Sequence, residues 1–200
     1  MPGLTIDDAE SFLPRYLNPE KKKQLFSEIN AFLATGKLLY YGEVDDPEPL
    51  QGDGWAAVPF FDSAEDQVRT TNVAVVSNSC DVTVENKRRV LPAILVAPIV
   101  SLAKYQALLE KHNTAQVTID VTISQIRRQE ITNLFYFPRG MALKEDSVLF
   151  LDRISHVSSI KFPRGESSIR LCRLSQQGFW LFLVKLAIHF CRSQEAIERR

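Results

Sequence analysis

The chain has few cysteines, and their number and spacing limit its chemistry. Cys80, Cys172 and Cys191 form an odd set without the close spacing of a zinc site. This pattern excludes a disulfide framework and favours a reducing compartment. We predict no bound metal and no cofactor.

Excess charge and long apolar runs are also absent. The sequence has 24 basic and 24 acidic side chains and a formal net charge of zero, so no overall field draws it to RNA or to an anionic membrane. The longest apolar run, residues 179–191, is interrupted by polar side chains and is too short to cross a bilayer. The first residues carry no basic and apolar signal segment. We therefore expect a cytoplasmic protein without membrane contact.

The composition itself is that of an ordinary globular protein. Hydrophobic residues make up 45% of the chain and charged residues 24%, both typical of a folded domain. A chain of 200 residues fits one domain, residues 1–200, that can bury a sizeable core.

Helix signals stand near the beginning of the chain. Asn18, Pro19 and Glu20 combine an N-cap residue, a proline suited to the first helical position and an acid in the first turn. Apolar residues then recur at helical spacing as far as Gly36. We predict a helical N-terminal extension over residues 5–35.

Short apolar runs separated by turn signals predict strands in two blocks, residues 38–100 and 131–162. Pro92 and Pro98 cannot donate to a ladder, so we expect them at strand ends or bulges. The individual strands are expected at residues 55–61, 68–76, 90–99, 134–137, 147–151 and 154–160.

Further helices are expected between and after these blocks. Residues 101–129 form a predicted helical insertion. Its second half, residues 117–128, alternates like a strand yet also has a helical face, and we favour a helix. Residues 175–199 predict a long C-terminal helix that is apolar nearly all round. Its polar stripe of Lys185 and His189 is expected at the edge that faces water.

The aromatic residues are expected mainly in the core. Trp55, Phe60 and Phe61 could stack on bases, but aromatics in strands usually pack inside. The triplet Phe135 to Phe137 cannot point inward as a whole because side chains alternate along a strand. One side of that strand must therefore meet another element.

A polar cluster, residues 77–81, follows the second predicted strand and offers the best candidate chemistry. Cys80 could act as a nucleophile if a base such as His112 or His156 lowered the pKa of its thiol. Under the alternative interpretation, Ser77 and its neighbours form a turn and Cys80 is a small buried apolar residue.

Four segments resemble the PemK/MazF family, the SH3-like barrel toxins of bacterial toxin–antitoxin pairs. They are the Gly-Asp turn and strand from Gly52, NVAVVSNSCD from Asn72, VLPAILVAPIVSL from Val90, and FPRGMALKEDSVLFLDRISHVSSIKF from Phe137. The resemblance implies an α+β fold: a small SH3-like β-barrel with N-terminal helices, a helical insertion and a long C-terminal helix. It also implies a homodimer and an antitoxin or other protein partner.

The chain departs from the pattern of the family's ribonucleases at three positions. Asn72 stands where the family has an arginine, Val100 where it has a hydroxyl residue, and Ser155 where it has a later arginine. An arginine there would supply a fixed cation for the scissile phosphate. We therefore expect a non-catalytic or altered-site binding module in a toxin–antitoxin or phage-defence setting. The alternatives are an RNA-cleaving toxin and, third, a cysteine-dependent hydrolase.

The candidate residues follow from these hypotheses. Catalytic candidates are Cys80, Asp81, Arg69, Ser77 and His156. Candidates for binding, including a basic rim for phosphate contacts, are Asn78, Ser79, Arg88, Arg89 and Ser101.

Overall fold

The computed structural model describes residues 20, 23, 27, 39–42, 47–63, 65–83, 92–165 and 168–191, the side chain of Cys191 excepted. Of the predicted N-terminal helices, only the helical positions Glu20, Lys23 and Ser27 belong to this part. The rest of that prediction lies outside the described residues.

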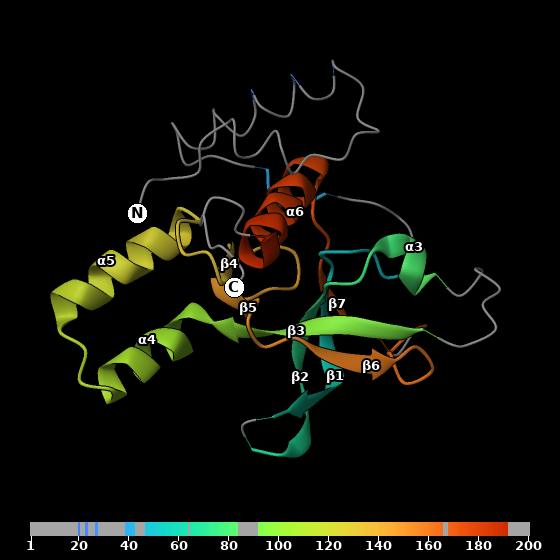
Figure 1. Cartoon of the computed structure of the whole chain (residues 1–200), viewed down its shortest axis with the longest axis horizontal. Coiled ribbons are helices and arrows are strands. Elements are labelled where there is room, and N and C mark those ends of the chain that lie inside the picture. Colours follow the sequence, from blue (N-terminus) through green and yellow to red (C-terminus); the bar gives the residue numbers. More distant parts are fainter. Residues whose placement is uncertain are drawn as a thin grey trace, which may run out of the picture.

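The described chain is mixed α+β, built on one antiparallel sheet (Figure 1). The strand order is β4-β5-β3-β2-β1-β7, and β6 pairs with β3 beside β5. The α+β class predicted from the sequence is confirmed. The strands are β1 (Gly54–Asp62), β2 (Gln67–Val75), β3 (Ala93–Ser101), β4 (Leu134–Phe137), β5 (Ser147–Phe150), β6 (Ser155–Ser158) and β7 (Arg170–Cys172).

The strand β3 is the centre of the sheet and changes partner along one edge. Its first half, Ala93 to Val96, pairs with β6, and its last residues, Ile99 to Ser101, pair with β5. Pro98 lies in the gap between these partners, so its missing N–H removes no bond to either strand. Pro98 therefore lies inside the strand rather than at its end, at a break in the ladder where the change of partner makes room for a proline.

Alternation of side chains along the strands divides the core between the two faces of the sheet. Ile94 and Val96 of β3 point into one core, whereas Ala97 and Ile99 belong to the other. The first core is enclosed by β1, β2, β3 and β6 and contains Trp55, Val58, Phe60, Val73, Val75, Val82, Ile94, Val96, Val157 and Phe162. Trp55 and Phe60 are buried as expected, while Phe61 is 43% exposed.

The second core lies under the C-terminal helix α6 (Gln176–Cys191). Phe182 of this helix packs edge-on against Phe135 of β4, with ring centroids 5.2 Å apart. Phe135 and Phe137 are fully buried here, and Tyr136 points to the other side, against α4 and α5. The aromatic triplet therefore meets a second element, as its alternation predicts.

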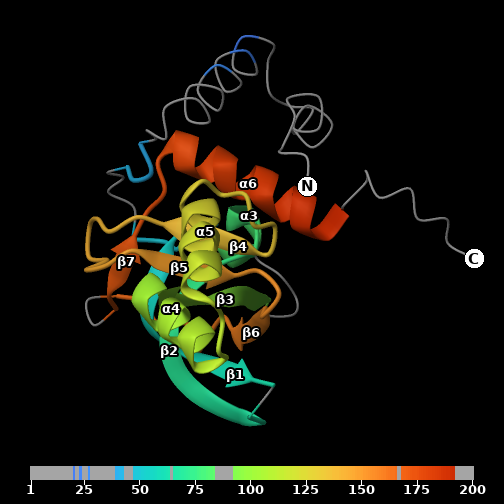
Figure 2. The same ribbon diagram turned by 90° about the vertical axis from the view of Figure 1, so that its left-hand side faces the viewer.

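The helices α4 (Leu102–Lys111) and α5 (Gln116–Arg127) form a helical hairpin beside the end of β3, and this hairpin faces the viewer in Figure 2. The helix favoured for residues 117–128 is confirmed. Ile119 and Ile126, seven residues apart, are its buried side chains, which is helical rather than strand spacing. A further helix, the single turn α3 (Ser79–Val82), follows β2.

Lys185 of α6 is not at a water-facing edge, contrary to expectation. The residue is 3% exposed, and its ammonium group donates to the carbonyl oxygens of Gln129, at 2.8 Å, and of Ile131. These carbonyls follow the C-terminus of α5, the negative end of its dipole. Periodicity along one helix does not reveal such acceptors, because they come from another part of the chain.

Gln129 extends this junction to the edge of the sheet. Its side-chain amide accepts from Tyr136 N at 3.1 Å and donates to Tyr136 O at 2.9 Å. The amide thereby bonds the backbone of β4 as a neighbouring strand would. It also donates to the hydroxyl of Tyr40. With the bond from Lys185 to the backbone oxygen of Gln129, α5, β4, α6 and the segment before β1 meet at this one residue.

Candidate functional site

The polar cluster after β2 bonds mainly to its own neighbourhood. Ser77 Oγ accepts from Leu95 N of β3 at 2.8 Å. The Asn78 side chain accepts from Cys80 N at 3.0 Å and caps α3. Ser79 Oγ accepts from Gln51 N at 3.0 Å, in the loop before β1. Each of these side chains satisfies a backbone donor, as turn and cap residues do.

Cys80 and Asp81 occupy the exposed side of α3. The interpretation of Cys80 as a buried apolar residue is wrong, because the single turn of α3 buries only Val82. Cys172 of β7 takes the buried role instead, and burial raises the pKa of its thiol to about 12. Of these two cysteines, Cys80 is the one accessible to reagents.

The strand ladder brings two of the catalytic candidates near each other. His156 of β6 is paired with Leu95, and Ser77 bonds to Leu95 from the opposite edge of β3. At the usual strand spacing the Cα atoms of Ser77 and His156 lie roughly 10 Å apart. His156 is exposed, on the same face as Leu95.

The remaining candidates are dispersed. Arg69 is paired with Phe60 near the turn of the β1–β2 hairpin and forms ion pairs with Asp62 and, at 3.6 Å, with Glu65. Ser77 lies eight residues further along the chain, up to roughly 26 Å away in an extended strand.

Ser101 lies at the far end of β3, where its hydroxyl caps α4 by accepting from Lys104 N at 3.2 Å. Arg88 and Arg89 are outside the described residues. The candidates Arg69, Ser77, Cys80 and Ser101 are therefore not brought together around one cleft in the described part of the chain.

Beside α3 lies a chain of alternating charges that the sequence analysis missed. Its centre is Asp53, whose carboxylate accepts from Arg173 at 2.7 to 3.2 Å and from Leu50 N at 3.0 Å. Both side chains are 2% exposed. Burial raises the pKa of Asp53, and the hydrogen bonds from Arg173 and Leu50 oppose that rise. The pair joins the turn before β1 to the residue after β7.

Three further side chains, Glu48, Arg164 and Arg170, extend this pair toward the surface. Arg170 approaches Asp53 at 3.7 Å, and its guanidinium lies over the ring of Trp55, 5.1 Å from the centroid. On the other side, Arg173 donates to the backbone oxygen of Glu48 at 2.6 Å, and the Glu48 carboxylate faces Arg164 at 3.7 Å.

This charge chain also holds α3. Arg164 donates to Val82 O at 2.9 Å and to Ser159 O at 3.0 Å. Gln51, two residues before Asp53 in the chain, donates to Val76 O at 2.8 Å. The polar cluster and the charge chain are thus one connected region. The Gly-Asp turn at Asp53 was visible in the sequence, but its arginine partners are more than 110 residues away, at a separation that no local pattern reports.

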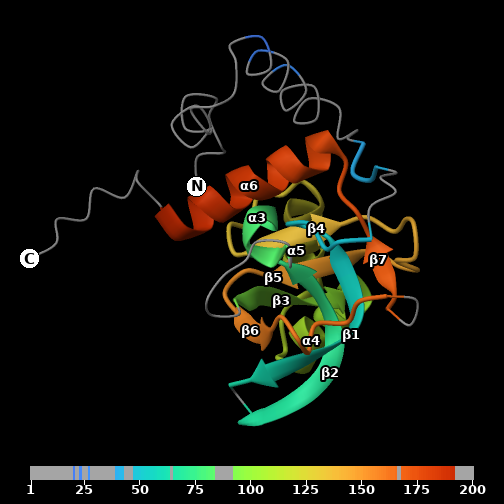
Figure 3. The ribbon, with the colours of Figure 1, turned by 90° about the vertical axis from the view of Figure 1, so that its right-hand side faces the viewer.

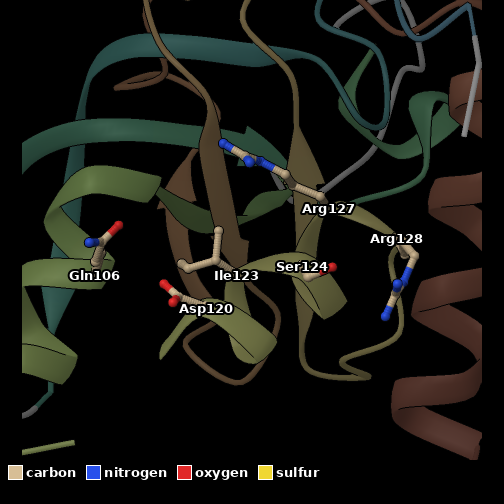
Figure 4. A pocket seen from close by; sticks show the side chains of 6 residues that line it. All are labelled: Gln106, Asp120, Ile123, Ser124, Arg127 and Arg128. Atoms are coloured by element: carbon tan, nitrogen blue, oxygen red, sulfur yellow. The ribbon is translucent and has the colours of Figure 1, made fainter. Parts of the chain in front are cut away.

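A shallow groove of about 440 Å³ lies between α4 and α5 (Figure 4). Arg127 is held at 3.3 Å by Asp146, and Arg128 is held at 2.7 Å by Glu130. Both guanidinium groups are therefore neutralised by neighbours. The groove is lined by Gln106, Asp120, Ile123, Ser124, Arg127 and Arg128.

The described residues contain no group of three histidine, cysteine or acidic side chains that could hold a metal ion. No described helix has the length and apolarity needed to cross a membrane. No family model and no curated sequence matches the chain.

Proposed function

We propose that the protein is a non-catalytic binding module on a PemK/MazF-like, SH3-like barrel, acting in the cytoplasm on a protein partner. The toxin–antitoxin or phage-defence setting is part of this proposal. The observation that carries it is that the candidate side chains bond to the backbone. Each of four accepts a hydrogen bond from a backbone N–H: Ser77, Asn78, Ser79 and Ser101. Such bonds stabilise turns and helix ends and leave no arranged acid, base and cation around one phosphate.

The barrel part of the proposal is supported by the first core. The strands β1, β2, β3 and β6 curl around Trp55, Val58 and Ile94, with β1 and β6 in contact across the interior. Gly52 has a φ of +89° in the turn that opens β1, and its N–H bonds to Val75 O at 2.8 Å. This is the Gly-Asp turn on which the family resemblance rests.

The loss of catalysis is supported by the position of Arg69. The catalytic candidate Arg69 is engaged by Asp62 and Glu65, at the end of the β1–β2 hairpin far from the polar cluster. A ribonuclease needs its cation beside the scissile phosphate during the reaction. An arginine held by two carboxylates at the other end of a strand does not meet that need.

A binding role is supported by the exposed apolar side chains of the α4–α5 hairpin. Leu108, Val117 and Val121 are 41%, 75% and 51% exposed. Val117 and Val121, one helical turn apart on α5, lie on the same face. Apolar side chains grouped on a surface in this way are typical of protein interaction sites.

Affinity purification of the tagged full-length chain, expressed with its neighbouring reading frames, tests the proposal. We expect the product of a neighbouring frame to co-purify with the wild-type chain and to be lost with Val121→Asp. The control is Ile160→Asp, which places the same charge at a 75% exposed apolar position after β6. Absence of a stoichiometric partner, or equal retention by both variants, would contradict the proposal.

A further inference from the structure

The strand β2 has an open edge along its first two thirds. It pairs with β1 from Gln67 to Ala74, but its pairing with β3 begins only at Val73. Within the described part of the chain, no strand lies against the other edge of residues 67–72. Figure 3 shows this half of β2 extending with β1 away from α6 as a two-stranded arm.

The backbone groups that face the open edge can be assigned from the ladder. Val75 N bonds to Asp53 O on the β1 side, whereas Val76 N bonds to Leu95 O of β3. Successive residues of an antiparallel strand alternate in this way. The even-numbered residues Val68, Thr70 and Asn72 therefore direct their N–H and C=O groups to the open edge.

Pro59 supports this assignment. It is the β1 partner of Thr70, and a proline has no N–H with which to complete a bonded pair. Thr70 must then sit at a non-bonded position of the β1–β2 ladder, with its own N–H and C=O turned outward. An unpaired row of such groups is a template for another strand.

The open edge carries none of the usual obstacles to pairing. Residues 67–70 and Asn72 are exposed, and Val68 is 68% exposed. The bulge of this hairpin lies in β1, between Trp55 and Val58, rather than in β2. The one charged side chain, Arg69, is neutralised by Asp62 within its own hairpin.

A second copy of the same edge fits this row of groups. In an antiparallel pair, directly opposed side chains lie on the same face of the sheet. Two identical strands related by a two-fold axis must therefore oppose one residue to its own copy, and the axis runs between these two copies. An axis at Arg69 would oppose two guanidinium groups, which is unfavourable. An axis at Thr71 would oppose Arg69 to Val73, which already pairs with β3. An axis at Thr70 opposes Val68 to Asn72 and Arg69 to Thr71, and leaves no like charges opposed.

We propose that residues 68–72 of β2 pair antiparallel with the same residues of a second copy, about a two-fold axis at Thr70. The hairpins of the two copies then form one continuous four-stranded sheet. The outward groups of Val68, Thr70 and Asn72 are satisfied, and the symmetric contact consumes the edge on both chains. This interface does not depend on the proposed function, since it involves none of the α4–α5 surface.

The mass of the chain in solution, measured by sedimentation equilibrium from micromolar to submillimolar concentration, tests the interface. The wild-type chain should rise from 22.7 kDa to twice that mass. Thr70→Asp and Thr70→Lys each oppose two like charges at the axis, and each variant should stay at the mass of one chain. An equimolar mixture of the two variants opposes unlike charges and should recover the doubled mass.

The control is Thr118→Asp, at an exposed threonine of α5 outside the β1–β2 hairpin. This variant should behave as the wild-type chain. Circular dichroism checks that the exposed substitutions leave the fold intact. The proposal is overturned if the wild-type chain keeps the mass of one chain throughout. It is also overturned if either Thr70 variant alone retains the doubled mass, or if the mixture fails to recover it.

Discussion

The buried Lys185 should make the stability of the protein depend on pH in an unusual direction. Desolvation by burial lowers the pKa of its ammonium group from 10.5 to about 7. As pH falls from 10.5 toward 7, the unfolded chain binds this proton first, so the free energy of unfolding decreases. Stability should therefore rise with pH above 7.

The magnitude follows from the size of the shift. Each pKa unit corresponds to about 1.4 kcal/mol, so the slope contributed by Lys185 should approach about 1.4 kcal/mol per pH unit above pH 7. The whole shift corresponds to roughly 5 kcal/mol, an upper bound. The neutral amine has two N–H donors, which match the carbonyls of Gln129 and Ile131.

Other groups set the upper limit of the useful pH range. Burial raises the pKa of both Tyr40 and Cys172 to about 12. The unfolded chain loses these protons first, from about pH 9 upward for the thiol, so their contribution makes stability fall with pH there. The rise from Lys185 is therefore cleanest between pH 7 and about 8.5.

Urea unfolding followed by tryptophan fluorescence, at several pH values in that range, measures this effect. Trp55, 2% exposed, should report the loss of the first core. Lys185→Met should remove the pH-dependent rise, whereas Lys104→Met, at an exposed position of α4, should preserve it. Equal slopes for the wild-type chain and Lys185→Met would show that Lys185 does not cause the pH dependence.

Substitutions at three further positions test other junctions by the same unfolding assay. Asp53→Asn leaves the buried Arg173 without its carboxylate and should cost about 3–5 kcal/mol; a loss below 1 kcal/mol would mean that the pair contributes little. Gln129→Ala leaves the backbone N–H and C=O of Tyr136 without the bonds from the Gln129 amide and should lower the free energy of unfolding by about 1–3 kcal/mol. An unchanged unfolding midpoint would contradict that role. Ser101→Ala should cost about 1 kcal/mol by uncapping α4, while Ser101→Asp restores the cap acceptor and should preserve stability; equal losses would argue against capping.

Local patterns predicted most of the strands because the burial of each strand determines the pattern of apolar residues along it. In β3, Ile94 and Val96 lie in one core and Ala97 and Ile99 in the other, so both faces are apolar and the run stands out. For residues 117–128 the helical spacing of the buried isoleucines outweighed the β-branched composition. Tertiary packing decided that segment rather than intrinsic propensity.

The features that the sequence concealed all join distant segments. The partner of Asp53 is Arg173, and Lys185 meets acceptors more than 50 residues earlier. The change of partner that accommodates Pro98 likewise needs β5 and β6, which come later in the chain. Composition and spacing describe neighbours in sequence, so such contacts leave no signal there.

The same limit applies to the candidate site. Ser77, Asn78 and Ser79 act as turn and cap residues, as the alternative interpretation of the sequence predicts, since a Ser-Asn-Ser run favours local hydrogen bonds wherever it occurs. The position of Arg69 at the far end of the hairpin depended on the register of β1 with β2. The hypothesis that these residues meet around a phosphate could therefore be judged only against the fold.

The proposed function is that of a binding module without ribonuclease activity. It is tested most directly by incubating the purified full-length protein with end-labelled single-stranded RNA. We expect the RNA to stay intact at stoichiometric protein, equally for the wild-type chain, Arg69→Ala and Ser77→Ala. Cleavage by the wild-type chain that is lost in Arg69→Ala or Ser77→Ala would contradict it, and would assign these residues to a catalytic site.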